Sequence, residues 1–306
     1  MIFFPYKADI ELKRLPIITV IVIAACIFVF LEQRSSAASY VSAVQNYCTE
    51  NSQRAIQTIL RYLPDHEGQH PCGVLLRIHR AADSDAEIEA LAEESTPMPF
   101  YANEEDGRRY IASVLREHYS SFASHVPHEL SESLVYDPKR IHVGRMLTSV
   151  LSHGDWAHLI GNLLFFYAFA AAVELIGGYA LFAGLIATLA VSTSLAYSYS
   201  VADADTALPT LGLSGVVMGM IAFVAAAAPT IGIRCFFWFL IYVRRFTIPS
   251  LLLAAWYIGW DIYDLTVRDP ESNINYVAHV SGAATGALAG LVFRLVRRDY
   301  LEIIRS

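Results

Sequence analysis

Three short groups of polar residues interrupt long apolar segments, and together they contain the side chains that nucleophilic catalysis requires. The first group holds His153, His158 and Asn162, the second is Gly-Leu-Ser-Gly at 212–215, and the third contains His279. A serine hydroxyl becomes an effective nucleophile when a neighbouring base, often histidine, removes its proton. The oxyanion that forms when serine attacks a carbonyl group needs hydrogen-bond donors held in fixed positions.

Each of these residues can be given a chemical role. Ser214 is the candidate nucleophile and His279 is the candidate base. His158 and Asn162 are four residues apart, so they share a helix face and can direct side-chain N–H groups at one oxyanion. Gly212 lets a substrate approach the backbone closely, and the backbone N–H of Ser214 adds a donor because Ser214 opens a helix.

The composition of the chain predicts an integral membrane protein. Of the 306 residues, 55% are hydrophobic and only 17% are charged, and the mean hydropathy is +0.41. A soluble domain carries about 25% charged residues. The formal net charge of −7 argues against nucleic acid as a partner, and four cysteines are too few for a disulfide scaffold.

The apolar segments are long enough to predict membrane-crossing helices, each of which needs about 20 mostly apolar residues. The first segment, 15–31, is interpreted as a retained anchor, because no small-residue cleavage pattern follows it as in a signal peptide. Five more spans are predicted at 158–177, 179–198, 211–228, 248–265 and 276–296. The expected fold is therefore an all-α membrane protein with six transmembrane helices.

The basic residues give this bundle an orientation. They gather before the first span (Lys7, Lys13, Arg14), between the fourth and fifth (Arg234, Arg244, Arg245) and from the end of the sixth onward (Arg294, Arg297, Arg298, Arg305). Six spans put all three groups on one side, which the positive-inside rule makes cytoplasmic. Segments 1–14 and 297–306 are then cytoplasmic, and Asp203 and Asp205 lie outside. The apolar segment 235–243 is too short to span, so it is predicted to be an interfacial helix.

This topology also predicts that the polar groups meet. The second, fourth and sixth spans all run from the outside inward, and each carries its polar group in its first turns. Small residues follow the helical period on two of these spans, at Gly212, Gly215 and Gly219 and at Gly282, Ala283, Gly286 and Gly290. Small-residue faces let membrane helices pack closely. Such packing would bring Ser214 within hydrogen-bond reach of His279.

A polar insert of about a hundred residues, 32–134, separates the first two spans and is predicted to be extracytoplasmic. Its segments 40–63, 83–94 and 104–124 have the periodicity and composition of helices. Cys48 and Cys72 both lie in it, and they either form a disulfide or remain as two buried thiols. The sequence does not reveal what the insert does.

At this point the residues resemble a known family. Residues 135–296 are similar to the core of rhomboid intramembrane serine proteases, through His153-x4-His158-x3-Asn162, Gly212-x-Ser214-Gly215 and Ala278-His279-x2-Gly282-x3-Gly286. The resemblance implies a Ser214–His279 dyad without an acid, with His158, Asn162 and Gly212 at the oxyanion. It also implies supporting roles for His153 and Arg145, a lateral substrate gate that includes Trp260, and no cofactor or metal.

Two positions depart from the family pattern. Gly144 stands where many members have a tryptophan before the arginine of the first loop. Met218 stands four residues after Ser214, where many members carry a tyrosine that stacks on the base. A thioether can also pack on an imidazole ring. Neither departure removes a catalytic group.

The expected function is an intramembrane serine endopeptidase that cleaves transmembrane segments near the outer membrane face through an acyl-enzyme. Its partners would be transmembrane protein substrates and the lipid bilayer, and the topology favours a bacterial inner membrane. One alternative is a non-catalytic rhomboid-like protein that binds membrane helices. A second is a metal-dependent hydrolase that uses the three histidines 153, 158 and 279, although no His-Glu-x-x-His motif is present. A third is a transporter with Glu174, Asp261 and Asp264 as pathway charges.

Overall fold

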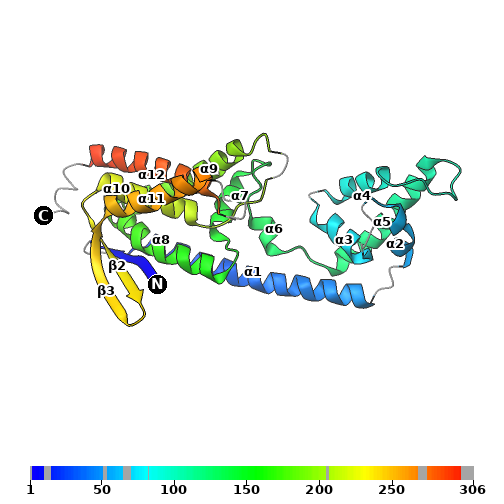
Figure 1. Ribbon diagram of the computed structural model, residues 1–306, viewed down its shortest axis with the longest axis horizontal. Helices are drawn as coiled ribbons and strands as arrows, with labels where there is room; N and C mark the ends of the chain where they lie inside the picture. The colour runs from blue at the N-terminus through cyan, green and yellow to red at the C-terminus, as the bar shows by residue number, and fades with distance from the viewer. Residues whose placement is uncertain are drawn as a thin grey trace. The chain divides into compact units, whose positions relative to one another are not determined.

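The computed structural model describes residues 2–9, 15–50, 54–64, 70–81, 83–204, 207–267 and 274–297 (Figure 1). These residues form two compact units, one made of Met1–Gln33 with Ser131–Ser306 and the other of Arg34–Leu130. Several residues used in the sequence argument lie outside the described residues, namely Lys13, Arg14, Asp205, Arg298 and Arg305. The first unit contains the three groups of candidate catalytic residues.

A helix is present in each of the six segments that were predicted to span the membrane. They are α1 (Ile17–Glu50), α8 (Trp156–Gly177), α9 (Tyr179–Ser200), α10 (Ser214–Ala227), α11 (Ser250–Val267) and α12 (Tyr276–Val296). Among the described residues, four helices are long and apolar enough to cross a membrane: the apolar part of α1, α8, α9 and α12. Six crossings therefore stay a prediction.

Helix α10 is short and lies among the other core helices. It has 14 residues, nearly all of them buried, and it packs against α8, α9, α11 and α12. A helix enclosed by protein on all sides is apolar around its whole circumference, and that is the pattern of this segment. Ser214, its first residue, is partly buried at the start of this helix.

The first turn of α1 is held by a buried carboxylate of α8. Glu174, whose exposed fraction is 1%, accepts hydrogen bonds from the backbone N–H of Ile18 (2.9 Å) and of Thr19 (2.7 Å) and from the Thr19 hydroxyl (2.7 Å). The first N–H groups of a helix have no partner within the helix, so a carboxylate at this point satisfies them. Glu174, considered above as a transport charge, thus has a structural partner.

The prediction of a helix at 235–243 is wrong. Strands β2 (Gly232–Phe239) and β3 (Tyr242–Pro249) form an antiparallel hairpin, and β1 (Ile2–Ala8) pairs with the other edge of β2. The segment Cys-Phe-Phe-Trp-Phe-Leu-Ile-Tyr-Val is rich in aromatic and β-branched residues, which favour strands, and it lacks a helical period. The fold is therefore mostly helical but not all-α.

This sheet links two segments that are far apart in the sequence. Lys7 of β1 pairs with Arg234 of β2, and the Arg234 guanidinium donates to Asp9 across 2.6 Å. Paired strands lie on the same side of any membrane that the chain crosses. Four core helices, α1, α8, α9 and α10, lie between them in the chain.

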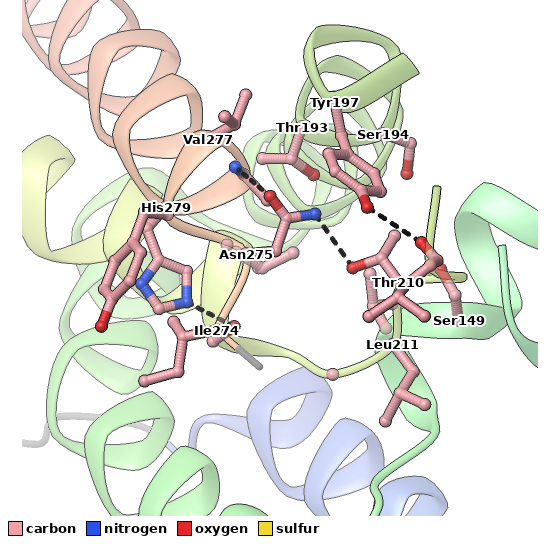
Figure 2. Close-up of a pocket in the computed structure, with 18 of the residues that line it drawn as sticks. Ser149, Thr193, Ser194, Tyr197, Thr210, Leu211, Ile274, Asn275, Val277 and His279 are labelled. Carbon is pink, nitrogen blue, oxygen red and sulfur yellow. Dashed lines mark hydrogen bonds between the residues drawn. The ribbon is translucent and has the colours of Figure 1, made fainter. Parts of the chain in front are cut away.

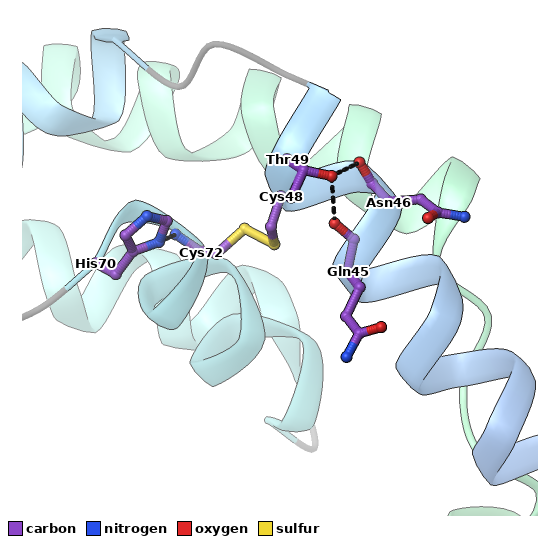
Figure 3. Close-up of a disulfide and its surroundings, with 6 residues drawn as sticks. All are labelled: Gln45, Asn46, Cys48, Thr49, His70 and Cys72. Atoms are coloured by element: carbon purple, nitrogen blue, oxygen red, sulfur yellow. Dashed lines mark hydrogen bonds between the residues drawn. A yellow bond between two sulfur atoms is a disulfide. The ribbon is translucent and has the colours of Figure 1, made fainter.

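The second unit has an apolar core of its own. Its elements are the end of α1, α2 (Arg54–Ile59), the 3-10 helix η1 (Leu60–Tyr62), α3 (Pro71–Arg80), α4 (Ser84–Glu93) and α5 (Glu104–His125). The side chains of Ile59, Leu75, Ile78 and Phe122 are fully or almost fully buried in it. A disulfide joins Cys48 to Cys72, which decides between the two alternatives left by the sequence (Figure 3).

Candidate active site

The interface between α10 and α12 is formed by backbone against backbone. A Cβ built on Gly286 of α12 would lie 2.6 Å from the carbonyl carbon and 2.7 Å from the Cα of Gly219 in α10. Gly282 likewise meets the backbone of Gly215, and Gly290 that of Phe223. Carbon atoms pack no closer than about 3.5 Å, so only glycine permits this approach.

The approach of the two helices joins the candidate nucleophile to the candidate base. Ser214 is the first residue of α10, and His279 lies in the first turn of α12. The His279 Nε2 atom is 2.8 Å from the Ser214 Oγ atom, within hydrogen-bond distance. In this arrangement the imidazole can take the serine proton directly.

The start of α12 is fixed by Asn275, as Figure 2 shows. Its side-chain oxygen accepts a hydrogen bond from the backbone N–H of Ala278 (3.0 Å), which caps the helix. Its amide nitrogen donates to the Thr210 hydroxyl (3.1 Å), four residues before Ser214. Asn275 therefore connects the helix that carries His279 to the segment that leads into Ser214.

Gly212 lies against the imidazole of His158. Its φ angle is +112°, a backbone conformation that residues with a Cβ rarely adopt. A Cβ at this position would lie 2.7 Å from His158 Nε2. The same Cβ would lie 3.8 Å from the Asn162 amide nitrogen. The N–H of Gly212 already donates to the carbonyl of Ser149 (2.9 Å), so this glycine contributes space and not a free donor.

The Asn162 amide nitrogen is a donor without an acceptor. It is buried and has no hydrogen-bond partner among the described residues. Buried polar groups are nearly always paired, so an unpaired donor next to Gly212, two residues before the candidate nucleophile, suggests that a ligand supplies the missing acceptor. On the same helix, Asp155 caps the start of α8 by accepting from the His158 N–H (2.8 Å), which fixes the turn that carries His158.

His153 supports this arrangement from the loop before α8. Burial, and then the nearby His158, lowers the pKa of His153 from 6.5 to about 4, so the ring is neutral at physiological pH. Its Nδ1 atom is 3.2 Å from the Leu151 carbonyl, and its ring meets the ring of His158 edge to face, with 5.1 Å between centroids. Its backbone N–H donates to the Gln33 side chain (3.2 Å).

The two remaining expected residues, Arg145 and Trp260, have contacts elsewhere in the fold. The Arg145 guanidinium, on α7 (Val143–Thr148), donates to the carbonyl of Glu132 (2.9 Å), on α6 (Leu130–Leu134), and so holds the loop before α8. Trp260 of α11 is half exposed (49%) and packs edge-on between Trp256 and Tyr263.

One residue beside the base was not predicted for this role. The carboxylate of Asp261 in α11 lies 2.9 Å from the Nδ1 atom of His279, a neighbour of the base that the sequence analysis did not predict. The available signal was an ionisable residue inside an apolar segment, which is costly and so suggests a partner. The ring of Tyr276 also lies edge-on to His279, 6.1 Å between centroids.

A cavity of about 850 Å³ lies next to Ser214 and His279. Its lining includes His158, Thr193, Tyr197, Gly212, Ser214 and His279, from helices α8, α9, α10 and α12 and the segment before α10. Figure 2 shows Thr193, Tyr197 and His279 around this cavity. The cavity has room for a peptide segment and water next to the hydroxyl. Within the described part of the chain, no group of three His, Cys, Asp or Glu side chains is arranged to hold a metal ion.

A serine that borders a cavity, a base in contact with it, and an unpaired amide N–H nearby on Asn162 are together able to perform acyl transfer. Comparisons with known proteins give the family of this chain. No curated protein matches the chain. The family model of the Rhomboid domain matches residues 140–296, which is just over half of the chain. The resemblance seen in the motifs is thereby confirmed, and the chain belongs to the rhomboid family.

Proposed function

We propose that this protein is an intramembrane serine endopeptidase that cleaves transmembrane segments of other membrane proteins near the outer membrane face. The observation that carries the proposal is the 2.8 Å contact between Ser214 Oγ and His279 Nε2 at the start of two packed core helices. Membership of the rhomboid family supports the same activity.

The first half of the reaction forms an acyl-enzyme. His279 accepts the Ser214 proton on Nε2 while Ser214 Oγ bonds to the carbonyl carbon of the scissile peptide. The negative charge that develops on the carbonyl oxygen is stabilised by N–H donors from Asn162, His158 and the Ser214 backbone. His279 then passes its proton to the leaving amine as the carbon–nitrogen bond breaks.

The second half releases the product. A water molecule from the cavity gives a proton to His279 and attacks the acyl carbon, and the proton returns to Ser214 when the ester bond breaks. A substrate helix has to unwind locally before this sequence begins, because its amides are engaged in their own hydrogen bonds. Small or helix-breaking residues near the cleaved bond therefore favour cleavage.

The topology of the proposal is six crossings with both termini in the cytoplasm of a bacterium and the insert outside. The pairing of β1 with β2 supports an even number of crossings before the hairpin. The basic residues Arg244 and Arg245 in β3 support a cytoplasmic hairpin. The disulfide between Cys48 and Cys72 supports an oxidising, extracytoplasmic location for the insert. In this topology, Trp260 belongs to the helix beside which substrate would pass laterally.

The experiment is cleavage of single-span test proteins by the purified protein in liposomes. Wild-type protein should release two fragments, and Ser214→Ala and His279→Ala should release none. Ser192→Ala is a matched control, since the Ser192 hydroxyl bonds the carbonyl of Leu189 in its own helix, α9. If Ser214→Ala cleaves as well as wild type, the proposed mechanism is wrong. If wild type binds the test helices but never cleaves them, the protein is a non-catalytic binder of membrane helices.

A further inference from the structure

Asp261 and His279 form a carboxylate–imidazole contact between two core helices. The Asp261 Oδ2 atom of α11 is 2.9 Å from the His279 Nδ1 atom of α12, and the two side chains are only 17% and 14% exposed. Among the described residues it is the one contact of a carboxylate with a basic side chain between core helices; the others lie in the insert, in the loop before α8 or at the hairpin. A carboxylate placed in an apolar helix needs a reason, and this contact supplies one.

We infer that Asp261 is a positioning residue for His279 and that the site operates as a serine–histidine–aspartate triad. This inference rests on the proposed protease function. The three groups form one line of contacts, from Asp261 Oδ2 to His279 Nδ1 and from His279 Nε2 to Ser214 Oγ, and they come from three different helices, α11, α12 and α10.

The hydrogen-bonding capacity of Asp261 determines which nitrogen of His279 carries the proton. An ionised carboxylate accepts hydrogen bonds and donates none, so the Nδ1 atom of His279 has to carry the proton. A neutral imidazole has one donor nitrogen and one acceptor nitrogen, so the Nε2 atom then presents its lone pair to the serine hydroxyl. Asp261 thus selects the tautomer that can accept the proton of Ser214. It also lies beside the positive charge that His279 acquires during attack.

Neighbouring groups do not duplicate this role. Tyr276 reaches the His279 ring edge-on, with 6.1 Å between centroids, and both nitrogens of His279 are already engaged. Asp264 lies one turn further along α11 and lines the cavity, and among the described ion pairs none joins it to His279. The contact with Asp261 is therefore specific to one carboxylate of α11.

The test compares three substitutions of Asp261 in the cleavage assay. Asp261→Asn should lower kcat by at least about tenfold, towards the roughly 10⁴-fold cost of the same change in soluble triads, with KM nearly unchanged. The reason is that an asparagine amide can donate to Nδ1 and so stabilise the wrong tautomer. Asp261→Ala should lose less, because it imposes no tautomer, and Asp261→Glu should recover part of the rate.

A spectroscopic measurement tests the same inference without a substrate. The ¹⁵N chemical shifts of labelled histidine, assigned to His279 by comparison with His279→Gln, report which ring nitrogen carries the proton. Wild type should show the proton on Nδ1, and Asp261→Asn should show a larger share on Nε2. Asp203→Asn, which changes an exposed loop residue, is the matched control and should behave as wild type in both measurements.

The outcomes separate this inference from the proposed function. If wild type cleaves, Ser214→Ala does not, and Asp261→Asn matches wild type in kcat, the triad is refuted while the protease remains. If all three Asp261 variants lose activity together with thermal stability, Asp261 only supports the fold, and the inference is again wrong. If Ser214→Ala retains activity, the proposed function itself fails, whatever the Asp261 variants show.

Discussion

The backbone contact between α10 and α12 makes Gly286→Ala the most informative structural perturbation. The new methyl carbon would lie 2.6 Å from the carbonyl carbon of Gly219 and 2.7 Å from its Cα. These are backbone atoms, so they cannot rotate out of the way. Since carbon atoms need about 3.5 Å, the two helices must separate by about 1 Å. Such overpacking costs about 1–3 kcal/mol of stability.

The same displacement should reach the catalytic groups. His279 lies seven residues before Gly286, which is about 10 Å along α12. If α12 moves as a rigid helix, a 1 Å separation lengthens the contact between His279 Nε2 and Ser214 Oγ from 2.8 Å to about 3.8 Å, beyond hydrogen-bond range. A misplacement of this size costs about 10²-fold in rate. We therefore expect Gly286→Ala to lose about a hundredfold in kcat/KM.

Two assays measure these effects together. Cleavage rates in liposomes report the contact, and thermal unfolding in detergent reports the packing. Unfolding can be followed with a thiol-reactive dye, because Cys26 and Cys235 are free and buried in the folded protein. Gly184→Ala in α9 is the matched control, since a Cβ on Gly184 meets nothing within 4 Å. If Gly286→Ala melts and cleaves like Gly184→Ala, the two helices are not in backbone contact and the reasoning is refuted.

Three further predictions concern groups away from the hydroxyl. Glu174→Ala removes the acceptor of three hydrogen bonds at the start of α1 and should lower stability by about 2–3 kcal/mol, and Thr19→Val should cost less, both measured by thermal unfolding. Burial lowers the pKa of His153 to about 4 in the folded protein, so as the pH falls the unfolded chain takes up a proton on His153 before the folded chain does. Stability should therefore fall as the pH drops from about 6.5 to about 4. A His153→Gln variant should show a flatter profile of melting temperature against pH. Replacing Cys48 and Cys72 by serine removes a cross-link between residues 24 apart and should destabilise the insert by about 3 kcal/mol. The loss should appear as faster proteolysis of the insert, and an unchanged digestion rate would contradict this prediction.

The sequence predicts the core of the site because its signals are local and periodic. Helical spacing is enough to put His158 and Asn162 on one face and to identify the glycines of α12 as a packing surface. The three polar groups each open an apolar segment, and the structure has helices starting at Trp156, Ser214 and Tyr276. Three helices that run in the same direction place their first turns at the same end of the bundle. The sequence therefore predicts that Ser214 approaches His279.

The parts that were missed depend on contacts between distant segments. The strand β2 is an apolar run whose conformation is decided by pairing with β1, more than 200 residues earlier, and hydropathy alone does not distinguish it from a short helix. The role of Asp261 depends on how α11 is rotated against α12, which spacing along one helix does not determine. The sequence predicts separate helices at 15–31 and 40–63, and the helical continuity of α1 between them, through residues 32–39, was missed because those residues are mostly polar or small.

The central claim is that the Ser214 hydroxyl is a nucleophile activated by His279. The most direct measurement is labelling of the protein in membranes with a fluorophosphonate probe, followed by mass-spectrometric mapping of the modified residue. We expect a single adduct on Ser214 that disappears in Ser214→Ala and is strongly reduced in His279→Ala. An adduct on another residue, or labelling of Ser214→Ala equal to that of wild type, would contradict the claim.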